Sequence, residues 1–419
     1  MKTATLPSYI ENISSESAIS QEFEYGAHNY HPLPVVLERG KGCKVWDPEG
    51  NEYFDFLSAY SAVNQGHCHP KIIAVLMEQA QKITLSSRAF YNAVLGQYAH
   101  FMTNMFGYDR MLPMNTGVEA AETAVKLARR WGYEVKGISK DKARIVFVNG
   151  NFWGRSIGAI SASTDPSSRN NFGPFVPGYD LVPYNDLDAL ESALKNPDVA
   201  GFMLEPIQGE AGVVVPDEGY LKGVRRLCDQ YHVLMIADEI QTGIGRTGKM
   251  LACDHELVRP DLLVLGKALS GGVMPVSAVL ADDEIMLTIR PGEHGSTFGG
   301  NPLGARVAMT AMEVLVSEGM IENADRLGVI FRAEMQKLVD RYPLLHLVRG
   351  KGLLNAVVIN DSEKSTTAWE LCIKMKENGL LAKPTHGNII RLAPPLVITE
   401  SQLMESLNRF ETALIQFQA

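Results

Sequence analysis

A series of short apolar runs separated by helical segments constrains the fold of this 419-residue chain more than any other feature. The runs lie at residues 145–148, 202–204, 233–237, 262–265 and 276–280, and each has the length of a buried strand. Continuously apolar strands that alternate with helices are typical of a largely parallel sheet covered on both faces. The sequence therefore predicts an α/β fold with a mostly parallel central sheet over residues 70–302.

The segments on either side of this region carry other patterns. Residues 45–56 predict two short strands around an Asp-Pro-Glu-Gly turn. Apolar spacing then predicts one long helix at 303–341, a strand at 352–359, and helices at 367–378 and 400–417. We therefore expect a flexible arm at 1–24, the first part of a small α+β domain at 25–69, a large domain at 70–302, and an interdomain helix with the rest of the small domain at 303–419.

Two helices of the large domain can be placed from their first residues. A helix at 70–82 opens with proline, which suits a first turn because its missing N–H has no partner there. A helix at 116–135 opens with Thr116 and Glu119, the spacing of a capping box. The sequence therefore places the start of this helix at residue 116, where the first backbone N–H groups have no partner within the helix.

Charge and cysteine usage exclude several classes of function. The net charge is −9 and no basic run is present, so we expect no nucleic-acid partner. The five cysteines are odd in number and far apart, which is typical of reduced thiols. No apolar run approaches the roughly 20 residues that span a bilayer. The first residues resemble neither a secretory signal nor an Arg-rich presequence. We therefore expect a cytoplasmic protein without membrane contact, with the mitochondrial matrix as the alternative.

Two near-motifs have simpler explanations than the sites they resemble. Residues 243–248 fit G-x-G-x-x-G, but no strand leads directly into them, and Met250 stands where a phosphate loop needs a hydroxyl. His67, Cys68 and His69 have the residue types of a metal site but no second pair at ligand spacing. We expect a glycine-rich turn and a structural turn, and no metal.

Asp238 and Lys267 are the strongest candidates for chemistry. Each follows an apolar run, so each places a charge at the carboxyl end of a predicted strand, where open α/β sheets bind their ligands. A lysine among apolar neighbours has a lowered pKa and can attack a carbonyl, and a nearby carboxylate can hold a protonated heterocycle. Pyridoxal phosphate enzymes need both groups: a lysine that binds the cofactor aldehyde and an acid that pairs with its pyridine nitrogen. A buried ion pair explains these two residues equally well.

Three further segments could contact such a cofactor. Residues 115–118 (Asn-Thr-Gly-Val) open a helix, so their N–H groups face an incoming anion. Residues 295–302, which contain Ser296 and Thr297, have the composition of another anion-contacting turn. Phe152 could stack on a ring, and Arg155 could bind a carboxylate. The alternatives are a helix cap without a ligand, core packing and a surface charge.

Residues 238–243 (Asp-Glu-Ile-Gln-Thr-Gly), 265–272 (Leu-Gly-Lys-Ala-Leu-Ser-Gly-Gly) and 295–302 together resemble the signature of class III pyridoxal-phosphate aminotransferases. The resemblance covers nearly the whole chain and includes residues 25–30, 64–70, 87–91, 115–119, 151–155, 205–215 and 382–395. It implies a fold-type-I transferase that binds pyridoxal 5′-phosphate and forms a homodimer with active sites at the subunit interface. It is strongest to the members that act on ornithine.

The resemblance also implies roles for the cofactor-binding residues. Lys267 would bind the cofactor covalently and shuttle a proton, and Asp238 would keep the pyridine nitrogen protonated. Phe152 would stack on the ring, and Gln241 would contact its phenolic oxygen. The phosphate and its surroundings would be contacted by Gly117, Val118, Ser296 and Thr297, of which Thr297 would act from the partner subunit.

A second set of residues would choose the substrate, again by resemblance. Tyr30 and Arg155 would hold the α-amino and α-carboxylate ends of L-ornithine, and Tyr60 would shape the pocket. Arg391 would receive the α-carboxylate of 2-oxoglutarate, and Glu210 would mask Arg391 while ornithine is bound. The implied reaction is ping-pong transfer of the δ-amino group to 2-oxoglutarate.

Other specificities remain alternatives at this point. Relatives in the family act on N-acetylornithine, 4-aminobutyrate or other ω-amines, and a member without turnover could serve as a binding protein. Phe298 and Met274 stand where relatives carry Tyr, and neither matches a position with a chemical role.

Overall fold

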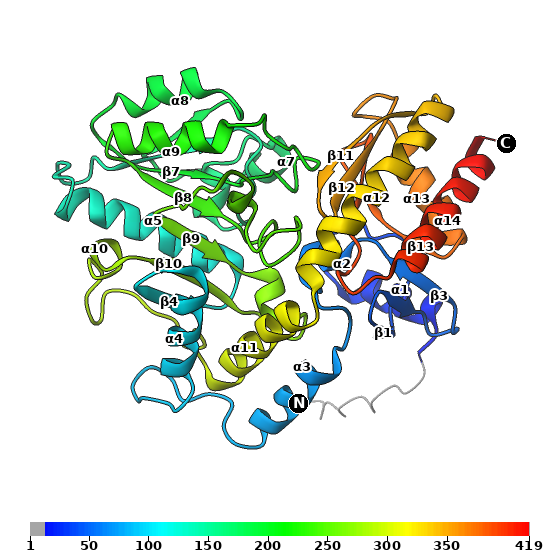
Figure 1. Cartoon of the computed structure of the whole chain (residues 1–419), viewed down its shortest axis with the longest axis horizontal. Helices are drawn as coiled ribbons and strands as arrows, with labels where there is room; N and C mark the ends of the chain where they lie inside the picture. The colour runs from blue at the N-terminus through cyan, green and yellow to red at the C-terminus, as the bar shows by residue number, and fades with distance from the viewer. Residues whose placement is uncertain (1–12, 419) are drawn as a thin grey trace, which may run out of the picture.

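The computed structural model describes residues 13–418, and a seven-stranded sheet organises its larger part (Figure 1). The strand order is β4-β10-β9-β8-β7-β5-β6. The strands are β4 (Arg110–Met114), β5 (Arg144–Val148), β6 (Tyr179–Val182), β7 (Val199–Leu204), β8 (Leu234–Asp238), β9 (Leu262–Leu265) and β10 (Ser277–Ala281). Neighbouring strands pair in parallel from β9 to β6. Only β10 runs antiparallel to both of its neighbours, so the predicted mostly parallel sheet is confirmed.

Helices cover both faces of this sheet because successive buried side chains of a strand point to opposite faces. Ile145 and Phe147 pack with α5 (Gly117–Glu134), whereas Val146 and Val148 pack with α8 (Leu187–Leu194) and α9 (Tyr220–Gln230). Near β10 the second layer is completed by α11 (Pro302–Ser317). Burial on both faces explains why these strands read as continuous apolar runs.

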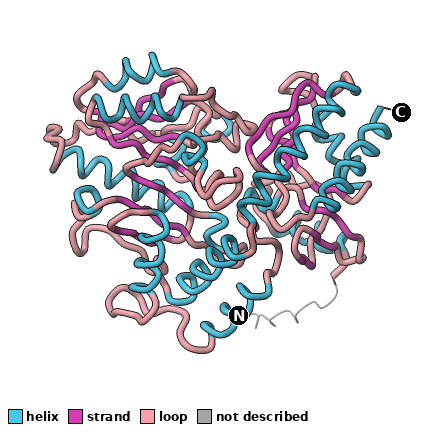
Figure 2. The backbone as a smooth tube through the Cα atoms, in the orientation of Figure 1, coloured by secondary structure: helices cyan, strands magenta, loops and turns pink. Residues whose placement is uncertain are grey.

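The other strands form two four-stranded sheets. In Figure 2 the strands of the seven-stranded sheet lie on the left and those of the two smaller sheets lie on the right. One sheet has the order β1-β2-β3-β13 and the other β11-β12-β15-β14. The strands are β1 (Arg39–Lys41), β2 (Lys44–Trp46), β3 (Glu52–Asp55), β11 (Leu345–Lys351), β12 (Leu354–Ile359), β13 (Leu380–Leu381), β14 (Lys383–Thr385) and β15 (Ile389–Leu392). Because β13 pairs with β3, the two ends of the chain share a sheet.

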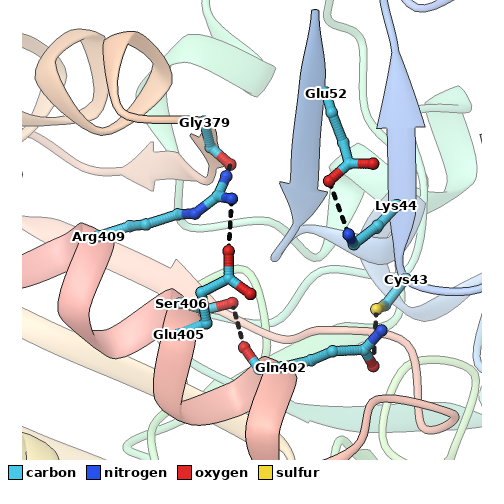
Figure 3. Close-up of polar contacts among 8 residues, drawn as sticks. All are labelled: Cys43, Lys44, Glu52, Gly379, Gln402, Glu405, Ser406 and Arg409. Atoms are coloured by element: carbon cyan, nitrogen blue, oxygen red, sulfur yellow. Dashed lines mark hydrogen bonds and ion pairs between the residues drawn. The ribbon is translucent and has the colours of Figure 1, made fainter.

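The C-terminal helix α14 (Glu400–Gln418) fastens these chain ends together (Figure 3). Arg409 donates to the carbonyl of Gly379 at 2.9 Å, and Gln402 accepts a hydrogen bond from the Cys43 thiol at 3.4 Å. Burial raises the pKa of Cys43 to about 11, so this thiol stays protonated at neutral pH. The contact between Cys43 and Gln402 therefore has a structural role. The domain boundaries predicted from the sequence stay a prediction.

Two helical predictions need correction. The single helix expected at 303–341 is two helices, α11 and α12 (Met320–Arg341), because Gly319 adopts a left-handed φ of 64° and ends the first. Residues 15–25 form helix α1 (Ser15–Tyr25) within the expected arm, since Ser14 caps it and Ser15 bonds to Glu49. Residues 1–12 of that arm lie outside the described residues.

The remaining helices connect these parts. They are the left-handed turn α2 (Ser58–Ser61), α3 (Pro70–Ala80), α4 (Leu95–Phe106), α6 (Ile157–Ser161), α7 (Pro166–Arg169), α10 (Asp283–Met286), α13 (Thr367–Glu377) and the 3-10 turns η1 (Ala252–Glu256) and η2 (Lys267–Ser270). Helix α5 begins with the predicted Thr116–Glu119 capping box. Within residues 13–418 no helix has the length and apolarity needed to cross a bilayer.

The two near-motifs have structural roles. Residues 243–248 form the predicted glycine-rich turn, in which the fully buried Arg246 donates to the carbonyls of Leu353 and Pro394. His67 pairs with Asp55 at 2.7 Å, and His69 pairs with Glu318 at 3.2 Å. The first motif therefore joins the large sheet to the C-terminal strands.

Candidate active site

Asp238 and Lys267 lie at the carboxyl ends of neighbouring parallel strands, as the sequence predicts. Asp238 is the last residue of β8 and is opposite Val264 of β9, three residues before Lys267. The backbone N–H of Glu239 donates to the Val264 carbonyl at 3.0 Å and extends this pairing past the strand end. Lys267 itself has a left-handed φ of 42°, a conformation that costs energy for a residue with a side chain.

Burial shifts the pKa of both groups toward their uncharged forms. It raises the pKa of Asp238 to about 7, while the hydrogen bond from the Ile240 N–H and the charge of Lys267 act in the opposite sense. It lowers the pKa of Lys267, and the nearby positive charge of Arg391 acts in the same direction. Burial therefore favours the neutral amine of Lys267, the form that can attack a carbonyl, while the charge of Lys267 favours an ionised Asp238.

A cavity of 370 Å³ opens between Lys267 and the first residues of α5. Asn115, Thr116 and Gly117 line it, so the positive dipole end of an 18-residue helix faces the same space as the lysine. The N–H groups of Asn115 and Thr116 already donate to the Glu119 carboxylate. A Cβ added at Gly117 would lie 3.1 Å from the Ile240 side chain, so the helix start packs against Ile240 more closely than a larger residue would allow.

Glu205 is a buried carboxyl at this edge that sequence reasoning missed. It accepts hydrogen bonds from the N–H groups of Phe152 at 3.0 Å and Gly209 at 3.1 Å. Burial raises its pKa to about 8, and the charge of Asp238 adds to the effect. The signal that identified Asp238 also marks Glu205, since it directly follows the buried strand β7. Glu205 thus fixes the loop that carries Phe152 and Arg155.

Glu210 and Arg391 form the ion pair expected between them. Glu210 Oε1 lies 2.7 Å from Arg391 Nη1 and also accepts from Gln241 Nε2 at 3.1 Å. Burial alone would raise the pKa of Glu210, but Arg391 holds it below the usual value. Arg391 Nε is buried without a hydrogen-bond partner in the described chain. Because Nε has no exposed surface, an anionic oxygen reaches it only after the groups that cover it move.

The other proposed substrate residues gather less tightly. The Tyr60 ring lies 4.9 Å from the Arg391 guanidinium carbon, within the ion-pair region. Tyr30 is 68% exposed, with its ring 6.0 Å from Lys383 Nζ. Arg155 is exposed, and its guanidinium carbon lies 5.7 Å from the Phe152 ring. The structure thus joins Tyr60 to Arg391 and keeps Arg155 beside Phe152.

The remaining predicted cofactor residues lie near α5. Val118 is in its first turn and packs close to Gly154, where an added Cβ would lie 2.5 Å from the valine side chain. Ser296 accepts a hydrogen bond from Asn115 Nδ2 at 2.7 Å within the same chain. Thr297 is exposed. Its expected action across a subunit interface remains a proposal.

Comparisons with known proteins place this site in a family. The family model for class-III aminotransferases matches residues 25–414. The mitochondrial ornithine aminotransferase of Rattus norvegicus is 64% identical over 96% of this chain and 91% of its own. An ornithine aminotransferase structure from Toxoplasma gondii, described with partial occupancy of pyridoxal phosphate at its active site, has a TM-score of 0.95 and 50% identity over 97% of this chain and 95% of its own. An acetylornithine aminotransferase structure from Elizabethkingia anophelis has a TM-score of 0.89 and 56% identity over 96% of this chain and 100% of its own.

The residues present fit pyridoxal 5′-phosphate. The buried amine of Lys267 suits its aldehyde, the carboxyl of Asp238 suits its pyridine nitrogen, and the N-terminus of α5 at Gly117 suits its phosphate. All three border one region at the carboxyl edge of the sheet, where α/β folds bind ligands. The chain belongs to the class-III aminotransferases, a family that uses pyridoxal 5′-phosphate.

Proposed function

We propose that this chain transfers the δ-amino group of L-ornithine to 2-oxoglutarate. The products are L-glutamate and glutamate 5-semialdehyde, which cyclises to pyrroline-5-carboxylate. The Glu210–Arg391 ion pair carries the proposal, because it lets one site accept two differently charged substrates in turn. The high identity to named ornithine aminotransferases supports it.

The chain's own residues divide the chemistry between them. The bound cofactor supplies an aldehyde carbon that takes the amino group and a protonated ring that withdraws electrons from the substrate carbon. Asp238 would keep the ring nitrogen protonated, and Phe152 would stack on the ring. Lys267 Nζ removes and returns the proton at the substrate's reacting carbon, since burial favours its neutral form. A Lys267→Ala variant is expected to lose turnover and borohydride-fixed cofactor; retained turnover would contradict this assignment.

Two arrangements of charge would select which amine reacts. With Glu210 paired to it, Arg391 does not attract the α-carboxylate of ornithine, so Arg155 and Tyr30 hold that end and the δ-amine reaches the cofactor. When 2-oxoglutarate enters, its α-carboxylate replaces Glu210 on Arg391. An arginine with a buried unpartnered Nε supports this exchange.

N-acetylornithine is the second candidate donor, supported by the 56% identity to the acetylornithine aminotransferase of Elizabethkingia anophelis. The two donors differ only at the α-amine, which is charged in ornithine and an uncharged amide in N-acetylornithine. The test compares kcat/KM for ornithine, N-acetylornithine and 4-aminobutyrate with 2-oxoglutarate as acceptor. Ornithine is expected to be fastest, and a faster reaction with either competitor would overturn the choice.

A homodimer with active sites at its interface is part of the proposal. Phe90 is 75% exposed and Tyr91 is fully exposed beside a cavity of 480 Å³ that also includes Leu95. Exposed aromatic side chains around a hollow favour a partner surface. Sedimentation equilibrium is expected to give twice the chain mass, and a monomer at micromolar concentration would contradict it.

We also propose a reducing compartment, the cytoplasm. All five cysteines are free and four of them are buried. The rat and fly relatives are named as mitochondrial proteins, and the matrix is the alternative that organelle fractionation would decide.

A further inference from the structure

Four consecutive residues that are not glycine adopt left-handed backbone angles in α2. Their φ values are 50° at Ser58, 45° at Ala59, 58° at Tyr60 and 73° at Ser61. This conformation brings Cβ close to the following carbonyl oxygen, and residues other than glycine and asparagine adopt it rarely and singly. A run of four persists only where the surroundings fix it.

Asp55 is the main residue that fixes this turn. Its Oδ1 accepts hydrogen bonds from the N–H groups of Leu57 at 2.8 Å and Ser58 at 2.9 Å. Its Oδ2 pairs with His67 Nε2 at 2.7 Å, which orients the carboxylate. The carboxylate thus satisfies the two N–H groups at the entrance of the turn.

The far side of the turn is fastened to the strand that carries Arg391. Ser58 Oγ donates to the carbonyl of Ala393 at 2.7 Å, and the Ala393 N–H donates to the carbonyl of Phe56 at 2.7 Å. Ala393 directly follows β15, which contains Arg391. The turn and the arginine are therefore held in one hydrogen-bonded unit.

The strained turn places one side chain at the substrate site. The Tyr60 ring lies 4.9 Å from the Arg391 guanidinium carbon, and Glu210 pairs with the same guanidinium at 2.7 Å. An arginine over an aromatic face is attracted by the ring, and the attraction is stronger away from water. Connecting β3 to the next segment does not by itself require left-handed backbone angles. The strain therefore points to a role for the turn in placing Tyr60.

We propose that Asp55 is a positioning residue for substrate recognition: by holding the left-handed turn it keeps Tyr60 against Arg391 and so strengthens binding of the 2-oxoglutarate α-carboxylate. The inference rests on the proposed function in taking 2-oxoglutarate as the acceptor. Asp55 acts through Tyr60 and touches neither cofactor nor substrate.

The test measures kcat/KM for each substrate of the holoenzyme, which in a ping-pong reaction reports each half separately. Asp55→Ala is expected to lower kcat/KM for 2-oxoglutarate about tenfold, mainly through KM, as suits a lost desolvated arginine–ring contact. The value for ornithine is expected to change less than about threefold, because Tyr30 and Arg155 hold its charged end and Tyr60 only shapes the pocket around it. Binding of unreactive glutarate, followed by calorimetry, should weaken in parallel.

Three further variants separate positioning from stability. Asp55→Asn keeps an oxygen for both N–H groups and should restore the acceptor KM. Asp47→Ala is the matched control, since Asp47 and Asp55 are both 6% exposed and Asp47 caps the neighbouring hairpin through Asn51 and Tyr53. It should lower the unfolding temperature without changing the substrate ratio. Ser58→Ala, which loosens the same turn more gently, should shift the ratio in the same direction and serves if Asp55→Ala does not fold.

A double-mutant cycle with Tyr60→Ala decides the route of the effect. Asp55→Ala should have no further effect on the acceptor KM once Tyr60 is gone. Additive losses, an unchanged substrate ratio in Asp55→Ala, or an equal shift in Asp47→Ala would each overturn the inference. If the unmodified enzyme does not use 2-oxoglutarate at all, the proposed function fails instead, and glutarate binding still tests the role of Asp55.

Discussion

Glu205 and Asp238 are buried carboxyls at the ends of neighbouring strands, brought together because Leu204 of β7 lies opposite Ala237 of β8. Burial raises the pKa of Glu205 to about 8 and that of Asp238 to about 7, and the charge of Asp238 adds to the shift of Glu205. The two hydrogen bonds accepted by Glu205 then tie the Phe152 and Gly209 loops together. Because folding raises the pKa of Glu205, the free energy of unfolding depends on pH.

The sign of this dependence follows from proton uptake. Between 4.5, the usual pKa, and about 8 the folded protein keeps the Glu205 proton while the unfolded chain releases it. Glu205 therefore contributes stability that is present at low pH and lost as pH rises toward 8. In Glu205→Gln the free energy of unfolding should therefore fall less steeply with pH, by up to about 1.4 kcal/mol per pH unit. Urea unfolding of both proteins at pH 6, 7 and 8 measures it, and parallel pH slopes would contradict it.

Replacing Asp238 tests the partner of the pyridine nitrogen. Asp238→Asn has nearly the same shape but cannot supply a negative charge, so kcat should fall by at least about 100-fold, the size typical of a lost electrostatic contact at a reacting group. Glu239→Gln is the matched control, because this adjacent buried carboxyl bonds to the Cys253 N–H and Thr242. It should lower stability while kcat stays within about threefold. Equal losses of kcat in both variants would refute a special role for Asp238.

Removing Glu210 tests the masking of Arg391. Without it Arg391 is free at all times, so α-amino donors such as glutamate should react better relative to ornithine. We expect the ratio of kcat/KM for glutamate to that for ornithine to rise about tenfold or more in Glu210→Ala, the scale of a charge-assisted hydrogen bond. Glu210→Gln, which keeps the size and loses the charge, should move the ratio in the same direction. Masking would be disproved by a ratio that stays at the original value in both.

The strand-end residues were the part of the site that sequence could predict. Asp238 and Lys267 each follow a run of buried residues, and the parallel pairing of β8 with β9 brings those runs together. The capping box of α5 was equally visible, because its signal is local. The two residues alone left a cofactor site and a buried ion pair equally favoured, and the predicted helix start at 115–118 and the family resemblance then favoured the cofactor site.

Features that depend on tertiary contacts were not predictable. The left-handed turn at Ser-Ala-Tyr-Ser is held by the nearby Asp55 and by Ala393, more than 300 residues away in sequence. The contact with Ala393 leaves no signal near the turn. The break between α11 and α12 depends on one glycine inside an apolar pattern that otherwise continues. The antiparallel direction of β10 likewise has no signal in a buried strand, because burial on both faces removes the alternation.

Gly209 provides a finer test of the Glu210 arrangement. A Cβ at this position would overlap the amide of Gln241, which donates to Glu210 at 3.1 Å, so Gly209→Ala must displace that amide. The direct bond from Arg391 to Glu210 remains, and the mask should loosen without disappearing. The glutamate-to-ornithine ratio should therefore rise about threefold, less than in Glu210→Ala. If Gly209→Ala left the ratio at the value of the unmodified enzyme, the Gln241 amide would have no part in holding Glu210.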